Sequence, residues 1–271
     1  MPELPEVETI ARGLAGALSG QRIVAVKVSL PKVASVSGDR TFIHELTGEG
    51  IAGVSRRGKF VVIGLLSGRS LVVHLRMTGR LVLRGPGEDA VHPHTHVVLG
   101  LGDGSCVHFS DARQFGRMRL VEPEEPWASQ LGYEPLSKDF TAARFASILG
   151  GRKTPVKVLL LDQRRIAGIG NIYACEALWE ARIDPGTPAK ALKKPAVRRL
   201  HRALAGVLSR AIEMGGSSVD DYVDAQGRQG SAQNVLSVYG REGKPCRRCG
   251  RHVVRTVLAQ RGTWWCRNCQ T

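Results

Sequence analysis

The sequence predicts an α+β protein with more than one domain: an N-terminal helix, an antiparallel β-sandwich or barrel, a helical region and a cysteine-rich C-terminal module. Short apolar runs at close spacing fill residues 22–121, which is typical of antiparallel sheets. Beyond them the apolar residues recur with a helical period. Four of the six cysteines then cluster near the end of the chain. With 271 residues, of which 42% are hydrophobic, the chain is long enough to bury one or two cores.

A helix is predicted at the N-terminus. Pro5 suits a first helical turn, and the acidic residues Glu6 and Glu8 favour a helix N-terminus. Gly20 marks its end. The apolar stripe of this helix consists of Val7, Ile10, Ala11, Leu14 and Leu18.

The strands of the first domain are predicted from alternation and from short apolar runs with Gly-containing turns between them. They cover residues 24–30, 60–66, 71–75, 81–83, 97–101, 106–109 and 117–121. The breaker-rich segment from Glu122 to Pro126 ends this pattern. Helices are then predicted over residues 141–149, 155–161, 171–181 and 195–214. A segment from Met214 to about Ser237, rich in Gly and poor in large apolar residues, is predicted to be a functional or disordered loop.

These patterns divide the chain into an N-terminal domain (residues 1–121), a linker (122–136), a helical domain (137–237) that contains the loop 215–237, and a C-terminal module (238–271). Because the sequence has neither a run of about 18 apolar residues nor a basic and apolar leader at its start, we expect a cytoplasmic protein without a membrane anchor.

The net charge indicates a polyanionic partner. Lys and Arg together number 39 and Asp and Glu 24, which gives +15. Phosphate groups attract such a surface, and its binding releases counterions. Charge alone does not separate DNA-binding proteins from other basic proteins.

The cysteines Cys246, Cys249, Cys266 and Cys269 form two C-x-x-C pairs. Two tight turns can supply four thiolates in a tetrahedron, so this spacing predicts one structural zinc ion; two disulfides or a redox motif are the alternatives. The intervening residues predict a β-hairpin with its tip at Arg261 and Gly262. Cys106 and Cys175 are isolated.

Two further features carry chemistry. Gly168-Ile169-Gly170-Asn171 precedes a helix, where glycines and an Asn cap allow a phosphate to approach free backbone N–H groups. Removal of Met1 would expose Pro2 as a secondary amine, which can attack a sugar carbon and form an iminium. Taken alone, the glycine-flanked Asn171 is purely structural about half the time, and a Pro-Glu start is almost always only a helix lead-in.

Together these features resemble the bacterial formamidopyrimidine-DNA glycosylases, which excise 8-oxoguanine. The matching stretches follow the order of that family. They are Met1–Thr9, Arg57-Gly58-Lys59, His74–Gly79, Asp111–Gly116, Gly168–Ala174, Val238–Arg241 and the four clustered cysteines.

The resemblance implies a bifunctional glycosylase and AP lyase that flips an oxidised purine out of duplex DNA. It implies a β-sandwich followed by a helix-two-turn-helix domain and a zinc finger, and a monomer without an obligate protein partner. Pro2 would be the nucleophile and Glu3 the general acid. Glu6 would position groups, and Lys59 would contact a phosphate near the lesion.

The resemblance also implies the DNA contacts. Met77, Arg113 and Phe115 would form the wedge that fills the space left by the flipped base; for Met77 and Phe115 the alternative is an ordinary core position. Asn171 and Arg261 would hold backbone phosphates. Further backbone or base-pocket contacts would come from His74, His94, Lys157 and Tyr239.

Two residues depart from the family pattern. The loop after Gly230 begins with Ser231 where an aromatic residue is common, and position 114 is Gln where a basic residue is frequent. The rival functions are an endonuclease VIII-like glycosylase for oxidised pyrimidines, a non-catalytic zinc protein that binds nucleic acid, and a basic enzyme with catalytic zinc.

Overall fold

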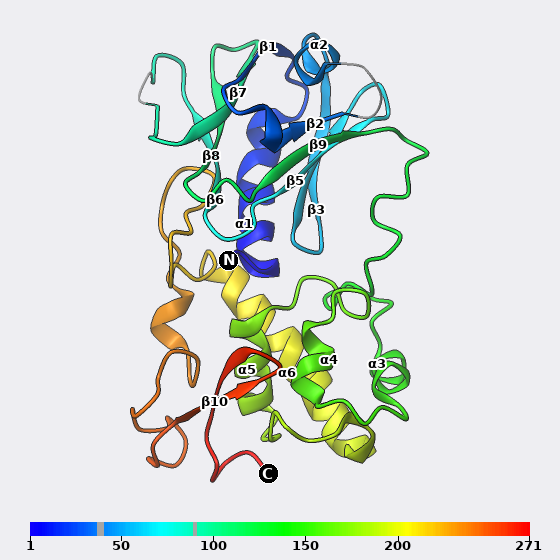
Figure 1. Ribbon diagram of the computed structural model, residues 1–271, viewed down its shortest axis with the longest axis vertical. Helices are drawn as coiled ribbons and strands as arrows, with labels where there is room; N and C mark the ends of the chain where they lie inside the picture. Colours follow the sequence, from blue (N-terminus) through cyan, green and yellow to red (C-terminus); the bar gives the residue numbers. More distant parts are fainter. Residues whose placement is uncertain (37–40, 89–90) are drawn as a thin grey trace. The chain divides into compact units, whose positions relative to one another are not determined.

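The structure of the chain, a computed structural model, describes residues 1–36, 41–88 and 91–271 (Figure 1). The chain forms two compact units. Unit 1 comprises residues 1–129 and 214–233, and unit 2 comprises residues 130–213 and 234–271. None of the helices in the described ranges combines the length and the apolar composition that crossing a bilayer requires.

Unit 1 is built from helix α1 and two sheets, which confirms the predicted N-terminal helix and β-sandwich. One sheet has the order β1-β7-β8-β6 and the other β2-β9-β5-β4-β3. The elements are α1 (Leu4–Leu18), β1 (Ile23–Val28), η1 (Pro31–Val33), β2 (Ala34–Ser35), α2 (Phe42–Leu46), β3 (Ile51–Arg57), β4 (Phe60–Leu65), β5 (Ser70–His74), β6 (Gly79–Arg84), β7 (Thr95–Leu101), β8 (Cys106–Asp111) and β9 (Arg117–Val121).

A single core joins the two sheets to α1. The predicted stripe of α1 is buried, and it packs with inward-facing residues of both sheets such as Ile63 and Phe109. Strand β3 was not predicted from the sequence. It is an edge strand whose residues are mostly half-exposed, and Gly53 lies beside an irregularity in its register, so it lacks a clear alternation.

Unit 2 contains the four predicted helices and the predicted hairpin: α3 (Ala142–Leu149), α4 (Val156–Leu161), α5 (Asn171–Glu180), η2 (Ala189–Ala191), α6 (Lys194–Glu213), β10 (Val254–Leu258) and β11 (Arg261–Trp265). The short helix η3 (Ala232–Val235) begins in unit 1 and ends in unit 2. Helix α6 is amphipathic, with buried residues three or four positions apart from Val197 to Ala211. Nearly all of α5 is buried, from Ile172 to Trp179.

The predicted position of the hairpin tip was wrong. Leu258 pairs with Arg261, so the two-residue turn is Ala259-Gln260, and Arg261 and Gly262 begin strand β11. Both turn residues have positive φ, 47° and 59°, as a two-residue hairpin turn of this twist requires. Because such turns usually contain Gly, Asn or Asp, the sequence pointed to Gly262 instead.

The residues after α6 fold back onto unit 1. Residues 214–233, grouped with the helical domain on sequence alone, belong to the compact unit that contains α1. Apart from η3, which starts at Ala232, the segment from Met214 to Ser237 has no helix or strand.

Candidate functional site

The N-terminus of α1 buries two carboxylates. Glu3 is 3% exposed and Glu6 1% exposed. Together they form a reciprocal capping box, in which the Glu3 backbone N–H donates to Glu6 Oε2 at 2.8 Å. Pro2, which precedes Glu3, is also buried. The residues expected to carry nucleophilic and acid chemistry therefore lie in one protected position.

Glu6 also anchors the segment that follows α6. Its Oε1 accepts a hydrogen bond from the Ser217 backbone N–H at 2.8 Å, and the Tyr222 hydroxyl donates to the Gly215 carbonyl at 3.1 Å. Gly216 has a φ of +81°, and a Cβ there would lie 3.1 Å from the Glu6 side chain. Glycine is thus required where this segment passes the helix N-terminus.

In the chain with Met1 attached, the Pro2 nitrogen is a tertiary amide and has no nucleophilic lone pair. The Met1 ammonium instead lies 3.4 Å from Asp220 Oδ2, at a partly exposed position. Nucleophilic chemistry at Pro2 therefore requires removal of Met1.

Lys59 lies in the tight turn between β3 and β4 and is 7% exposed. Arg56 ties this turn to α1: its Nε lies 2.8 Å from Glu8 Oε2, and its Nη1 donates to the Gly58 carbonyl at 2.9 Å. Burial raises the pKa of Glu8, but hydrogen bonds from Arg56 and Arg12 outweigh burial and lower it. Glu8 is therefore a stable anchor for the turn that carries Lys59.

His74 is a neutral neighbour of Lys59. Burial, followed by the charges of Arg76 and Lys59, lowers the pKa of His74 to about 3. Its Nδ1 accepts a hydrogen bond from the Arg76 backbone N–H at 2.9 Å, which assigns the proton to Nε2. The Phe60 ring packs edge-on against it, with a centroid distance of 4.6 Å. At neutral pH, His74 is a fixed hydrogen-bond donor without charge.

The expected wedge residues are exposed, so the alternative of core positions is wrong for them. Met77 is 42% exposed and Phe115 50% exposed. The Arg113 guanidinium lies 5.0 Å from the centre of the Phe115 ring, which is a cation–π distance. Large exposed apolar residues on adjoining loops are typical of a binding surface.

Asp111, to which the sequence analysis gave no role, organises these loops. It is 1% exposed, and its carboxylate accepts hydrogen bonds from the backbone N–H groups of Arg113 (3.2 Å) and Gly116 (2.6 Å) and from the Thr78 hydroxyl. Its own N–H donates to the carbonyl of His94, an exposed residue with a φ of 69°. The buried carboxylate thus links the loops that carry Met77, Arg113 and Phe115, and the Asp111 backbone N–H adds the loop that carries His94. Arg113 and Gly116 lie in the same Asp111–Gly116 stretch as the carboxylate, but the bond to Thr78, 33 positions away, cannot be seen in a local motif.

In unit 2, Lys157 and Asn171 meet at the start of β11. Lys157 Nζ donates to the Gly262 carbonyl at 2.9 Å and to the Thr263 hydroxyl at 2.8 Å, and Asn171 Nδ2 donates to the same carbonyl at 3.0 Å. Lys157 is fully buried and Asn171 partly buried. They therefore fix the backbone beside Arg261, whose own side chain is exposed.

Tyr239 is held by a carboxylate that the sequence analysis missed. Glu176, 6% exposed, accepts hydrogen bonds from the backbone N–H groups of Ser237, Val238 and Tyr239 at 2.8–2.9 Å. Burial raises the pKa of Glu176, and these three donors oppose that rise. The Tyr239 ring packs against Trp264 of the hairpin, with a centroid distance of 4.5 Å.

The four clustered cysteines fit a zinc ion. Their sulfur atoms all lie within 4.8 Å of one another, with Cys249 Sγ 3.5 Å from Cys266 Sγ and Cys246 Sγ 4.0 Å from Cys269 Sγ. These distances are too long for disulfides and suit four thiolates around one Zn²⁺. Trp179 donates from Nε1 to Cys246 Sγ at 3.4 Å. Because all four positions are thiolates, the ion would be structural.

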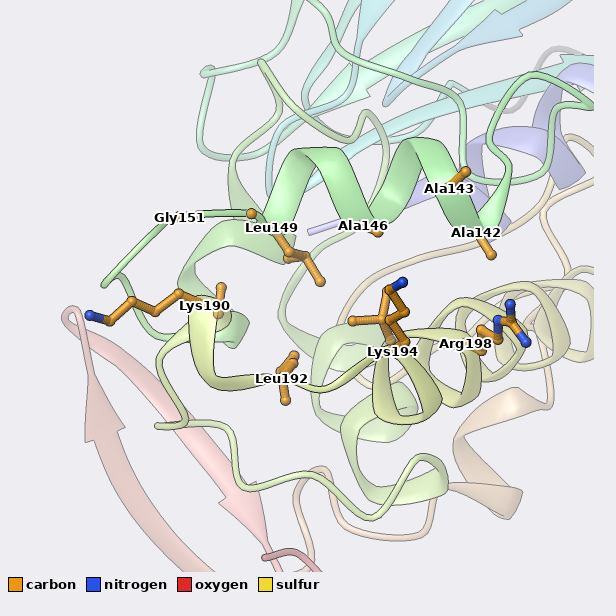
Figure 2. A pocket seen from close by; sticks show the side chains of 12 residues that line it. Ala142, Ala143, Ala146, Leu149, Gly151, Lys190, Leu192, Lys194 and Arg198 are labelled. Atoms are coloured by element: carbon orange, nitrogen blue, oxygen red, sulfur yellow. The ribbon is translucent and has the colours of Figure 1, made fainter.

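A further cavity lies in unit 2, apart from these residues. It has a volume of about 450 Å³, lies between α3 and α6, and has an apolar floor of Ala and Leu side chains with Lys190, Lys194 and Arg198 at its rim (Figure 2). None of the residues expected to act on DNA or sugar lines it.

Comparisons with known proteins cover most of the chain. Residues 1–118 match the formamidopyrimidine-DNA glycosylase N-terminal domain, residues 131–223 match the formamidopyrimidine-DNA glycosylase H2TH domain, and residues 243–271 match a zinc finger found in FPG and IleRS. The formamidopyrimidine-DNA glycosylase of Heliobacterium modesticaldum is 45% identical over 276 residues and covers 100% of both chains.

Solved structures give the same result. A Lactococcus lactis FPG mutant in complex with DNA containing Fapy-dG superposes with a TM-score of 0.91 at 35% identity, over 99% of each chain. The FPG protein of Thermus thermophilus superposes with a TM-score of 0.88 at 43% identity, over 99% of this chain and 98% of that one.

Proposed function

Because the chain belongs to the formamidopyrimidine-DNA glycosylase family, we propose that it is a bifunctional base-excision enzyme that removes oxidised purines from duplex DNA and then cleaves the strand. The observation that carries this proposal is the buried N-terminus of α1, where Pro2, Glu3 and Glu6 lie together. A protein that only binds nucleic acid has no need to bury two carboxylates beside its second residue.

The chemistry begins with Pro2 after Met1 has been removed. The lone pair of the Pro2 nitrogen attacks the anomeric carbon of the flipped nucleotide, the bond to the damaged base breaks, and the N–H proton of Pro2 passes to the departing base. Glu3 gives a proton to the ring oxygen of the sugar, the ring opens, and an iminium forms between Pro2 and the sugar. Loss of a sugar proton then expels the 3′ phosphate and, in a second elimination, the 5′ phosphate, which leaves a one-nucleotide gap.

Lys59 and His74 bind the backbone at the lesion in this proposal. Lys59 supplies a positive charge for a phosphate, and neutral His74 supplies a directed N–H donor. A positively charged His74 imidazole would repel the Lys59 ammonium. Because the low pKa of His74 keeps the imidazole neutral, both side chains can lie side by side and bind the DNA backbone.

Met77, Arg113 and Phe115 form the wedge. The flexible Met77 side chain fills the space left by the flipped base, Arg113 faces the unpaired cytosine, and Phe115 packs against the base stack. The buried Asp111 carboxylate positions the wedge, because it accepts hydrogen bonds from the backbone N–H groups of Arg113 and Gly116.

Backbone binding away from the lesion falls to unit 2. Asn171, at the start of α5, and Arg261, at the start of β11, each hold a phosphate. Lys157 acts by placing the Gly262 carbonyl beside them, and Tyr239 and His94 supply lesser contacts. One structural zinc ion, held by Cys246, Cys249, Cys266 and Cys269, maintains the hairpin.

We propose that residues 215–237 cover the flipped base, because this segment is tied to Glu6 through Ser217. A monomeric state without an obligate protein partner and action in the bacterial cytoplasm also belong to the proposal. Ser231 stands where an aromatic residue is common and cannot stack on the flipped base. We therefore expect residues 215–237 to favour ring-opened purines over 8-oxoguanine.

An excision assay tests the proposal on matched duplexes that contain 8-oxoguanine opposite cytosine, a ring-opened purine opposite cytosine, or thymine glycol. We expect release of both purine lesions at least tenfold faster than of thymine glycol, and strand cleavage on both sides of the lesion. Faster release of thymine glycol would assign the chain an endonuclease VIII-like specificity. No release of any lesion would leave only nucleic-acid binding.

A further inference from the structure

Strands β6 and β8 carry a ladder of polar residues on the face opposite the core. Alternate residues such as Leu81 and Phe109 point into the core. The register pairs Arg80 with Ser110, Val82 with His108, and Arg84 with Cys106 on the other face. An outward face of an antiparallel sheet is normally open to water.

This face is instead covered. His108 is 4% exposed and Ser110 5% exposed. The Leu83 backbone N–H donates to the Ala225 carbonyl at 2.8 Å, so residues 223–227 run along the edge of β6, as the path of the chain beside that strand shows (Figure 1). All of these residues belong to unit 1.

The covered face encloses a cavity of about 80 Å³, lined by Arg80, Arg84, His92, His108, Ser110 and Val223, among others. Two buried polar atoms at this cavity, His108 Nδ1 and Arg84 Nε, have no hydrogen-bond partner in the described part of the chain. The other ring nitrogen of His108 is engaged by Cys106 Sγ at 3.1 Å. Buried polar atoms without partners are costly, and a bound ion or water molecule would satisfy them.

The lining chemistry selects an anion. Its polar groups are guanidinium, imidazole and hydroxyl, and the lining residues within the described ranges include no carboxylate. Two of the lining arginines have acidic neighbours at distances near 4 Å: Asp221 lies 3.9 Å from Arg80 and Glu88 3.8 Å from Arg84, and both acids are more than half exposed. Arginine forks match tetrahedral oxyanions, and the volume admits one such group.

We propose that this cavity binds a single tetrahedral oxyanion of the phosphate class and thereby fastens residues 223–227 to the sheet. Burial, followed by the charge of Arg84, lowers the pKa of His108, so the ring is neutral and offers one N–H donor from Nδ1. The bound anion would bridge His108, Arg84 and the covering segment.

The consequence for catalysis rests on the proposed function. The segment that the anion would fasten begins a few residues after Ser217, which is bonded to Glu6 at the N-terminus of α1. Occupancy of the cavity would therefore restrict the loop that covers the flipped base. Binding of the anion itself requires neither DNA nor a lesion, so it is tested separately.

The binding test uses the full-length protein without DNA, titrated with inorganic phosphate at constant ionic strength and compared with chloride. We expect saturable stabilisation in thermal unfolding and one site per chain by calorimetry. Arg84→Met should weaken phosphate binding at least tenfold. Lys27→Met, which removes an exposed charge from the same sheet, should leave it within twofold. Absence of a saturable response, or equal responses in both variants, would mean that the cavity holds water only and would overturn the proposal.

A second variant, on the covering segment, keeps the test decisive if Arg84→Met does not fold. Val223→Asp places a carboxylate in the cavity from the covering segment, so it should fold without phosphate and abolish the phosphate response. Retention of the full response would contradict the site. Binding of an undamaged duplex then identifies the source of the phosphate group. If Arg84→Met binds the duplex within twofold of wild type, the site takes free phosphate. If Arg84→Met loses duplex affinity tenfold, and free phosphate weakens duplex binding by the wild-type protein to the same extent, the site takes a phosphate of the DNA backbone.

Discussion

The N-terminus of α1 and the hairpin β10–β11 use buried polar groups for opposite purposes. At α1, the proposed general acid Glu3 is itself buried, and buried Glu6 accepts a hydrogen bond from the glycine-rich segment that follows α6. At the hairpin, the buried groups Lys157 and Asn171 hold the backbone so that the exposed Arg261 can act. Loss of a buried group should therefore stop chemistry in the first region and weaken binding in the second.

The largest effect is expected from Cys249→Ser, which removes one zinc ligand from the second region. A structural zinc site contributes on the order of 10 kcal/mol to the folding of a small module. Zinc content by atomic emission should fall well below one ion per chain, and duplex binding should weaken at least tenfold. The control is Cys106→Ser, outside the cluster, which should keep its zinc. Full metal content in Cys249→Ser would contradict the ligand set.

Glu3→Gln tests the first region. The Gln side chain has nearly the same size and shape as Glu but cannot act as a general acid. Base release should therefore slow by about 100- to 10,000-fold, the range of general acid catalysis. Duplex affinity should stay within about threefold, which gel-shift titration would measure. Parallel losses of release and binding would mean that Glu3 acts by holding structure.

Asp111→Ala separates positioning from contact. Three hydrogen bonds to a buried carboxylate are lost, each of about 1.5–3 kcal/mol, although such contributions are not additive. Discrimination between lesion and undamaged duplexes should fall about tenfold, and the melting temperature should drop. Asp103→Ala, in an exposed turn, is the matched control. Unchanged discrimination would show that the loops keep their shape without Asp111.

Arg261→Ala should reduce binding to damaged and undamaged duplexes alike and lower the slope of log affinity against log salt by about one. Arg261→Lys keeps a charge and should restore the slope. A slope that does not change in Arg261→Ala would rule out a phosphate contact.

The smallest effect concerns pH. The pKa of His74 falls from its ordinary 6.5 to about 3 in the folded chain, so the unfolded chain binds more protons between these values. His74 therefore contributes stability that is present above pH 6.5 and is lost as the pH falls towards 3, by at most about 1.4 kcal/mol per pH unit. In His74→Gln, the free energy of unfolding from chemical denaturation should depend less steeply on pH between pH 4 and 6.5 than in the wild type. An unchanged pH dependence would mean that His74 keeps its ordinary pKa.

The sequence predicted those features that depend on local periodicity and spacing. The stripe of α1, the helices α3 to α6 and the four-cysteine cluster were confirmed because each is a repeated local pattern. It missed β3, an edge strand with little buried surface, and misplaced the hairpin turn, since Ala259 and Gln260 are unusual at positive φ.

The parts of the site that escaped prediction are contacts between distant segments. Asp111 bonds donors on two loops, Glu176 bonds three consecutive N–H groups about 60 positions away, and Ser217 reaches Glu6 across most of the chain. A sequence names such residues but does not show which backbone groups they meet. For the same reason the fold of residues 214–233 onto unit 1 was not predicted from their place after α6.

The most direct test of the central claim is the intact mass, followed by peptide mapping, of the protein trapped with borohydride on an 8-oxoguanine duplex. The account predicts one covalent adduct per chain, on a protein that lacks Met1, with the sugar attached to the nitrogen of Pro2; Pro2→Gly should lose most of it. An adduct on a lysine, or efficient trapping by a chain that retains Met1, would contradict it.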